Sequence, residues 1–425
     1  MSSPELIWKN RNFIKFFAAN ALSNLGNWFD FVSVLILFRY TWKADPMLIA
    51  LIPVMYAVPS ILFGQFAGVF ADQKDQLKIL VYSDWIRAGL TVLLIVSPAP
   101  LFALPVLLLR NTAGVVSLPA QQALMRKIVE EEDIMKAVTL NGSLFQLVKV
   151  IGPLIGGSVA SLLSPRFSIG VNAVSFMLSA IVLLRIRIRQ QNDRTQAERS
   201  SSAKPSHFLS SWKEGWMIVL RNRILLASVL FGIGSTLTIQ MIDAQIVTLF
   251  SEVFPNTSEI TGWAISSIGI GSLLIVLLLN RMNSMSKYGW FFGGGSLLIG
   301  VMVWGFGFLA NYNYSLLAIC LSLIGGVGNG MVYAAVNYLI QKEPPQHAIG
   351  RVSGILDSTL SVLFIAGPLL GGVMISQFGI FAAFKGIGMS LTFLGFSGIL
   401  LQKLLWKRNK NTDNNKIKSD GEAVS

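Results

Sequence analysis

The sequence predicts an all-α polytopic membrane protein, with twelve transmembrane helices in two pseudo-symmetric six-helix bundles. Hydrophobic residues make up 53% of the 425-residue chain and charged residues only 13%, whereas average soluble proteins carry roughly 25% charged residues. A soluble domain of this composition would have too few polar residues to cover its water-exposed surface. Apolar runs of about 20 residues, the length that a spanning helix needs, recur along the chain, and the hexad Gly-Pro-x-x-Gly-Gly occurs once in each half.

Twelve apolar runs are long enough to cross a membrane. In order, they cover residues 12–40, 47–71, 79–97, 101–125, 137–163, 167–187, 223–250, 261–280, 288–310, 314–340, 351–376 and 379–403. Most connections are very short, but the stretch of about 190–222 is rich in Arg, Gln, Asn and Ser. We therefore predict four parts: an N-terminal six-helix bundle, a cytoplasmic linker, a C-terminal six-helix bundle and a disordered cytoplasmic tail, over residues 1–190, 191–222, 223–406 and 407–425.

The linker contains apolar residues at helical spacing, with Lys213, Glu214 and Arg221 between them. These residues are Phe208, Leu209, Trp212, Trp216, Val219 and Leu220. The spacing predicts an amphipathic helix on the inner membrane surface. The alternative is that these residues begin the seventh span.

The charges predict the orientation. The formal net charge is +13, which in a soluble chain would indicate a nucleic-acid partner. Here the lysines and arginines fall in loops: with a cytoplasmic N-terminus, the outer loops hold only Arg39, Lys43 and Arg166. The positive-inside rule then predicts a multi-pass protein of the cell membrane, with both termini cytoplasmic and membrane lipids, not nucleic acid, around it.

The sequence lacks the usual signatures of an enzyme. One cysteine, Cys320, and two histidines, His207 and His347, cannot form a disulfide or a Cys/His metal cluster. There is no Walker A pattern, and no nucleophile–base pair appears in the spans. We expect a monomeric, non-enzymatic protein with no cofactor and no metal.

The two halves of the chain repeat each other. The run Gly152-Pro153-Leu-Ile-Gly-Gly157 of the fifth span returns 215 residues later as Gly367-Pro368-Leu-Leu-Gly-Gly372 in the eleventh. Two parallel six-helix repeats are typical of a transporter with a central site between its halves. The hexads could serve passive helix packing, or act as hinges that seal the outer half, and these roles are compatible.

Several motifs resemble those of the major facilitator superfamily. Gly68-Val-Phe-Ala-Asp72-Gln-Lys74 resembles its inner-loop motif, Arg110-Asn-Thr-Ala-Gly114 its Arg-x-x-x-Gly signature, and the two hexads its antiporter motif. Three further stretches resemble the drug:proton antiporter branch that holds macrolide-efflux and siderophore-export proteins: Ser83-Asp84-Trp-Ile-Arg87, Pro119-Ala, and 172–180. The sequence departs from the loop motif at Gln73 and Asp75, where Arg and Gly are usual, and its second copy is reduced to Asn280-Arg281.

The resemblance implies the major facilitator fold, with spans 1, 4, 7 and 10 lining a central cavity that opens to one side at a time. It implies a secondary transporter that exports an amphipathic small molecule, such as a drug, a macrolide-like compound or a siderophore, in exchange for protons. Such efflux underlies multidrug resistance. Two alternatives remain: a proton-coupled uptake symporter, and a transport-inactive membrane sensor or scaffold.

The resemblance also implies a gate at the inner side. Gly64 and Gly68 would let helices approach closely, and Asp72, with Lys74 beside it, would help to hold the inner side shut through Arg351 at the start of span 11. The alternative for Asp72 is a solvated loop charge. Asp84 and Arg87, three residues apart on one helical face, could pair with each other for a structural or a gating purpose.

Charges deep in the membrane are the sharpest signal, because an isolated buried charge costs several kcal/mol or is neutralised. Asp30 ends a polar stripe that includes Asn27, and Arg110 and Lys149 fall at similar depth. We predict that Asp30 and the two bases form one buried cluster, with at least one base within about 4 Å of the carboxylate. The alternative is an ion pair with a purely structural role.

In the C-terminal half, Asp243 continues a stripe with Thr236 and Gln240, and no equally deep base accompanies it. Desolvation should then disfavour its charged form. We therefore predict that Asp243 carries the transported proton, while Asp30 stays ionised beside two cations. The resemblance favours Asp30, and the two assignments both remain open.

Overall fold

The structure is a computed structural model of the full chain. It describes residues 7–130, 133–186, 216–220, 222–255, 257–279, 288–310, 314–342 and 349–406. Within these ranges every regular element is a helix and no strand occurs, so the predicted all-α class is confirmed.

The described residues of the first half form nine helical elements. They are η1 (Ile7–Lys9), α1 (Arg11–Ile36), the π-helical turn η2 (Leu37–Thr41), α2 (Pro46–Gln73), α3 (Gln76–Val96), α4 (Pro100–Gly114), α5 (Ser117–Ile128), α6 (Ile134–Leu162) and α7 (Pro165–Leu184). The predicted fourth span is thus two helices, α4 and α5. It breaks just after Gly114, a residue type that disfavours helix interiors.

From residue 222 onward the described residues form eight further helices. They are α9 (Arg223–Asp243), α10 (Gln245–Val253), α11 (Ser258–Leu279), α12 (Tyr288–Phe306), α13 (Ser315–Lys342), α14 (Ile349–Phe378), α15 (Ile380–Leu400) and α16 (Gln402–Leu405). The predicted seventh span is also divided, because α9 ends at Asp243 and α10 begins two residues later.

Polar caps and prolines set where many helices start. The side chains of Asn10, Asp45, Asp75, Ser164 and Asn222 accept hydrogen bonds from the first free backbone N–H groups of α1, α2, α3, α7 and α9. Three helices place proline in the first turn, where its missing N–H and fixed φ do no harm: Pro46, Pro100 and Pro165.

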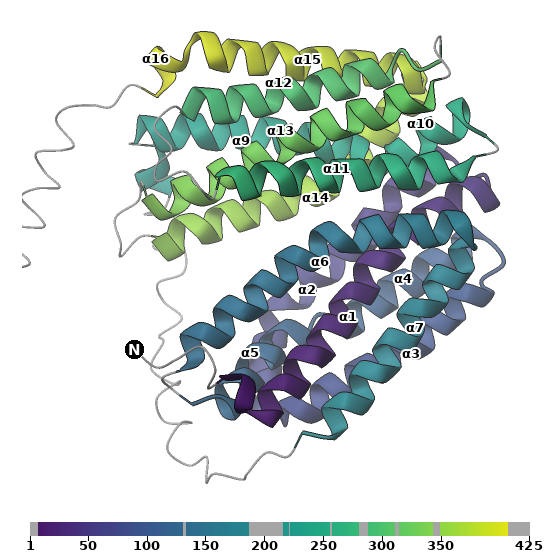
Figure 1. Ribbon diagram of the computed structural model, residues 1–425, viewed down its shortest axis with the longest axis vertical. Coiled ribbons are helices and arrows are strands. Elements are labelled where there is room, and N and C mark those ends of the chain that lie inside the picture. The colour runs from purple at the N-terminus through teal and green to yellow at the C-terminus, as the bar shows by residue number, and fades with distance from the viewer. Residues whose placement is uncertain are drawn as a thin grey trace, which may run out of the picture.

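Figure 1 shows two groups of helices, α1–α7 below and α9–α16 above, which we call the N-terminal and C-terminal bundles. Within the N-terminal bundle α1 packs on α6 and α7, and within the C-terminal bundle α12 packs on α13 and α15. The main contacts between the bundles join α6 to α11 and α2 to α14. The arrangement has the same pseudo-symmetry as the sequence repeat.

The helices are long and apolar enough for a membrane protein. Among the described residues, eleven helical segments could cross a bilayer by length and composition. The 29-residue helix α6 is not one of the eleven, and several of its side chains lie outside the described residues. The predicted count of twelve spans stays a prediction.

The domain boundaries also stay a prediction. Most of the predicted linker, 191–215 and 221, and the whole predicted tail, 407–425, lie outside the described residues. Of the predicted amphipathic helix, residues 216–220 are described and are helical.

The bundles meet at one end of the molecule, on the right in Figure 1, where an apolar cluster of the N-terminal bundle takes in Ala244 and Val247 from the C-terminal bundle. We call this the distal end, because it lies opposite the start of α1. It contains the connections 41–46, 97–100 and 163–165, the end of α10 and the starts of α11 and α13. In the orientation predicted from the charges, the distal end is the outer side.

Candidate functional site

A buried ion pair lies in the middle of the N-terminal bundle. Asp30 on α1 and Arg110 on α4 are in contact, with 2.6 Å between Asp30 Oδ2 and Arg110 Nη2. The two side chains are 0% and 2% exposed. The predicted contact between Asp30 and a deep base is therefore present, and its partner is Arg110. The third predicted member, Lys149 on α6, has its side chain outside the described residues.

Tyr56 on α2 completes the pair, and the sequence interpretation missed it. Its hydroxyl donates a hydrogen bond to Asp30 Oδ2 (2.9 Å) and accepts one from Arg110 Nη2 (2.7 Å). The depth of Tyr56 along its helix could have identified this residue. Tyr56 lies ten residues after Pro46, the first residue of α2, and Arg110 lies ten residues after Pro100, the first residue of α4. Their polar tips therefore fall at the same level, about 15 Å from the distal end.

The three side chains leave two buried polar atoms without a hydrogen bond inside the described part of the chain: Asp30 Oδ1 and Arg110 Nη1. A carboxylate oxygen with a free lone pair can accept a proton or a donor group, and a guanidinium N–H can donate to an acceptor. The cluster of Asp30, Tyr56 and Arg110 therefore combines a site for a proton with donor capacity for a polar ligand group. We call it the buried triad.

A second polar network lies beside the triad and involves Asp84 and Arg87 of α3. These two side chains are 3.6 Å apart, as the predicted pair requires. Asp84 also accepts hydrogen bonds from Ser179 (2.6 Å) and Ser23 (3.4 Å). Arg87 donates to Asn27 Oδ1 (2.5 Å), so Asn27 belongs to this network.

The stripe along α1 places the two networks next to each other. Ser23 and Asn27 contact the Asp84–Arg87 pair, and Asp30, one turn further along, is a member of the buried triad. The guanidinium of Arg87 also lies 4.0 Å from the centre of the Phe176 ring, a favourable position for a buried cation. One face of α1 therefore contacts both polar networks in the core of this bundle.

The first hexad packs α6 against α1 next to these networks. A Cβ added at Gly152 would lie 2.3 Å from Trp28 Cβ, and one added at Gly156 would lie 2.6 Å from Phe29 Cα. Both distances are far below van der Waals contact, so only glycine fits. The third glycine faces the other bundle, since a Cβ at Gly157 would lie 3.1 Å from Gly262 Cα of α11.

The second hexad repeats this arrangement in α14, which contains Pro368 in its interior. A Cβ at Gly367 would lie 2.4 Å from Gln240 Cβ, and one at Gly371 would lie 1.9 Å from the Met241 carbonyl oxygen. The third glycine again faces the opposite bundle: a Cβ at Gly372 would lie 2.9 Å from Ala50 Cβ of α2. In both repeats the hexad thus supports close helix packing, and its last glycine lies at the contact between bundles.

Polar contacts also join the bundles at the distal end. Arg39 of η2 forms an ion pair with Glu252 and donates a hydrogen bond to Ser251, both on α10. The hydroxyls of Tyr40 and Thr261 are 2.7 Å apart. A third contact runs from the Gln245 side chain to the carbonyl oxygen of Pro46 (2.9 Å).

The predicted site residues of the C-terminal half are arranged differently. Gln240 is buried and packs on Gly367. Asp243 is the last residue of α9, directly before the helix break, and its side chain is exposed. Its role as the proton carrier stays a prediction.

The predicted inner gate is described only in part. The side chains of Asp72, Pro153 and Arg351 lie outside the described residues, so their roles stay predictions. Lys74 follows the last residue of α2 and is exposed. A Cβ at Gly64 or Gly68 would meet nothing within 4 Å. This corrects the expectation of close helix approach at these glycines, which lie toward the end of α2 that is opposite the distal end.

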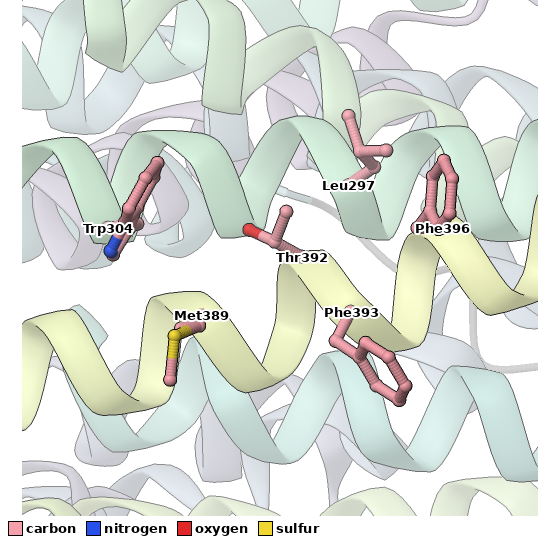
Figure 2. A pocket seen from close by; sticks show the side chains of 6 residues that line it. All are labelled: Leu297, Trp304, Met389, Thr392, Phe393 and Phe396. Atoms are coloured by element: carbon pink, nitrogen blue, oxygen red, sulfur yellow. The ribbon is translucent and has the colours of Figure 1, made fainter.

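A groove of about 290 Å³ lies elsewhere, between α12 and α15. Figure 2 shows its lining: Leu297, Trp304, Met389, Thr392, Phe393 and Phe396. The side chains of Met389 and Phe393 are 62% and 74% exposed, and the lining contains no charged residue. It shares no residue with the buried triad or with the predicted site, so we do not assign transport to it.

Comparison with known proteins gives one family. The family model described as the Major Facilitator Superfamily matches residues 16–368. The chain is 28% identical over 411 residues to the uncharacterized MFS-type transporter YfiS of Bacillus subtilis, covering 96% of this chain and 97% of YfiS.

Two further relatives have names that state a substrate. Macrolide efflux protein A of Streptococcus pyogenes is 22% identical (88% of this chain and 91% of that protein). The staphyloferrin A transporter of Staphylococcus aureus is 23% identical (88% and 92%). Among solved structures, a bacterial homologue of the human lysosomal transporter Spinster superposes with a TM-score of 0.68 at 12% identity, covering 92% of this chain and 95% of that one.

Proposed function

Since the chain belongs to the major facilitator superfamily, we propose that it is a secondary transporter that exports an amphipathic small molecule in exchange for protons. The substrate classes that the relatives' names suggest are a macrolide-like drug and a siderophore. The exporter works in the cell membrane as a monomer, with both termini in the cytoplasm.

The observation that carries the proposal is the buried triad. A carboxylate with its side chain fully buried at mid-helix depth is too costly to retain without a partner, and an ionisable residue in a spanning segment is by default a functional candidate. Asp30 is paired with Arg110 through one oxygen, while its other oxygen is free to take a proton. We propose Asp30 as the proton-carrying acid, because its buried carboxylate keeps one oxygen without a hydrogen bond, whereas Asp243 lies exposed at a helix end.

The proposed mechanism is a rocking of residues 1–190 against residues 223–406, with the cavity open to one side at a time. The contacts of Arg39, Tyr40 and Gln245 hold the distal end closed. When the bundles rock, those contacts open, and Asp72 and Arg351 pair to close the other end. The driving force is ample: one pH unit is worth ~1.4 kcal/mol, and 100 mV adds ~2.3 kcal/mol for each charge moved.

The test of this function is an export screen. A strain that lacks the protein and a strain that overproduces it are exposed to a panel of amphipathic drugs and siderophores, and the accumulation of each labelled compound is measured. We expect at least one compound to accumulate more without the protein and less when it is overproduced. Charge reversal by Asp72→Lys serves as a second variant, and it should abolish export while leaving substrate binding largely intact.

The same screen separates the alternatives. Higher accumulation in the overproducing strain would indicate a proton-coupled uptake symporter. If purified protein in liposomes moves none of the compounds that affect the strains under an imposed pH gradient, the chain is a transport-inactive sensor or scaffold, and the proposed export is refuted.

A further inference from the structure

Tyr56 stands between the proton site and the contact that joins the two bundles. Its hydroxyl touches both members of the ion pair, donating to Asp30 and accepting from Arg110. Its ring packs edge-on against Phe31, with 5.3 Å between the ring centres, so the phenol has little freedom to turn. Tyr56 is the one member of the buried triad that belongs to α2, and α2 is a helix that contacts the opposite bundle.

The segment of α2 around Tyr56 is built to bend. Pro53 and Pro59 lie inside the helix, three residues before and three residues after Tyr56. Each proline lacks the N–H that would bond to the carbonyl four residues earlier, and its ring crowds that carbonyl. Two backbone hydrogen bonds are therefore missing within two turns, and proline sites are where helices kink.

The part of α2 beyond these prolines forms the distal contact. The Pro46 carbonyl accepts a hydrogen bond from Gln245. Met47 and Ala50 lie against Gly372, the last glycine of the second hexad. Along α2, the residues of the distal contact therefore come first, followed by Pro53, by Tyr56 of the triad and by Pro59.

We propose that Tyr56 is a positioning residue that transmits the protonation state of Asp30 to α2, and thereby controls whether the distal contact between the bundles can open. The inference rests on the proposed proton exchange at Asp30. While Asp30 is ionised, the phenol donates to a carboxylate, and such charge-assisted hydrogen bonds are roughly twice as strong as neutral ones. The bond holds the middle of α2 against α1 and α4, which keeps Met47 and Ala50 on Gly372.

A proton on Asp30 weakens this restraint. The neutral carboxyl accepts less strongly and becomes a donor itself, so the bond from Tyr56 loses its charge assistance. α2 is then free to bend between its prolines, and the distal contact can separate. The ionised and empty protein therefore stays closed at the distal end, which prevents a futile conformational cycle.

The titratable and charged groups described around Asp30 enter the test. They are Arg110 from α4, Tyr56 from α2 and the Asp84–Arg87 pair from α3; the side chain of Lys149 on α6 lies outside the described residues. None of the α3 or α6 groups is changed by a substitution at Tyr56. Tyr56→Phe removes only the hydroxyl, so a change that it causes in the pH dependence of the separated fraction can be attributed to that hydroxyl.

The experiment measures the distance between the bundles at the distal end as a function of pH. Spin labels are placed through Arg166→Cys and Leu316→Cys, at exposed positions near the distal starts of α7 and α13. The natural cysteine is removed by Cys320→Ser, because it is exposed. Pulsed electron paramagnetic resonance on the purified full chain then gives the fraction of molecules with separated distal ends, with no substrate needed.

With Tyr56 intact, we expect acidic pH to raise the separated fraction. Tyr56→Phe removes the hydroxyl that links the Asp30 carboxylate to α2, so the separated fraction at neutral pH should rise severalfold, toward its value at acidic pH. Tyr288→Phe, which removes a hydroxyl from a buried tyrosine of the other bundle, should leave the pH dependence of the separated fraction unchanged. A pH dependence that is the same in Tyr56→Phe as in the Tyr288→Phe control overturns the inference.

A second variant covers the event that Tyr56→Phe does not fold. Pro59→Ala restores a backbone hydrogen bond to α2, so it should reduce the separated fraction at acidic pH severalfold. An unchanged separated fraction in Pro59→Ala also overturns the inference. Because this titration needs no transport, it decides the role of Tyr56 even if the export screen fails, and the two failures can be told apart.

Discussion

Replacing Gly156 by alanine is the sharpest test of how the hexads support the site. The added Cβ would lie 2.6 Å from Phe29 Cα and 2.7 Å from Phe29 O, and these are backbone atoms that no rotamer change can move. Carbon atoms pack best at about 3.5–4.0 Å, so α6 and α1 must separate by about 1 Å. Overpacking of this kind typically costs ~1–3 kcal/mol.

The separation should also impair transport, because Phe29 is next to Asp30 in α1. A movement of about 1 Å at Phe29 is enough to stretch a hydrogen bond of normal length out of contact, so we expect the pair between Asp30 and Arg110 to weaken. The assays are the free energy of unfolding in mixed detergent micelles and the rate of proton-driven export.

The matched control is Gly142→Ala, on the same helix. A Cβ there would meet nothing within 4 Å, and alanine favours a helix by ~0.5–1 kcal/mol over glycine. This variant should be as stable as the natural chain or more so, with normal export. If Gly156→Ala matches Gly142→Ala in both stability and export, the close packing of α6 on α1 is not what positions Asp30.

Three further outcomes follow from the site. Asp30→Asn leaves Arg110 buried without its counter-charge and should lower the free energy of unfolding by about 3–5 kcal/mol; Arg110→Met in the same chain should recover most of that loss in a chemical unfolding experiment. Arg39→Ala removes the contact to Glu252, which is half exposed, so it should change stability by less than ~1 kcal/mol yet raise the fraction of molecules separated at the distal end, as seen by spin-label distances. Asp243→Asn should retain substrate-induced proton release in detergent, because its carboxyl is exposed; loss of release there, with release intact in Asp30→Asn, would reverse the assignment of the proton.

The features that depend on composition and spacing could be predicted from the sequence. Apolar runs predicted the helices, and the repeated hexad predicted equivalent positions in the two bundles. A contact between Asp30 and at least one of two deep bases followed from depth, because a buried charge is not tolerable alone; that the base is Arg110 came from the structure.

The features that depend on helix rotation and on conformation could not be predicted. Tyr56 was overlooked because a tyrosine in an apolar run looks like a packing residue, and only the rotation of α2 shows that its hydroxyl meets Asp30. Asn27 contacts Arg87 and not Asp30 for the same reason. The exposure of Asp243 depends on a helix break after that residue, and the open space at Gly68 depends on which end of the bundles is closed.

The central claim is that Asp30 couples export to proton movement, and transport by purified protein in liposomes tests it most directly. Two rates are measured with a compound identified by the export screen: net movement driven by an imposed pH gradient, and exchange of labelled for unlabelled compound without a gradient. For Asp30→Asn we predict that gradient-driven movement is lost while exchange continues, since a neutral residue can neither take up nor release the proton. Gradient-driven movement at the natural rate in folded Asp30→Asn would contradict the account.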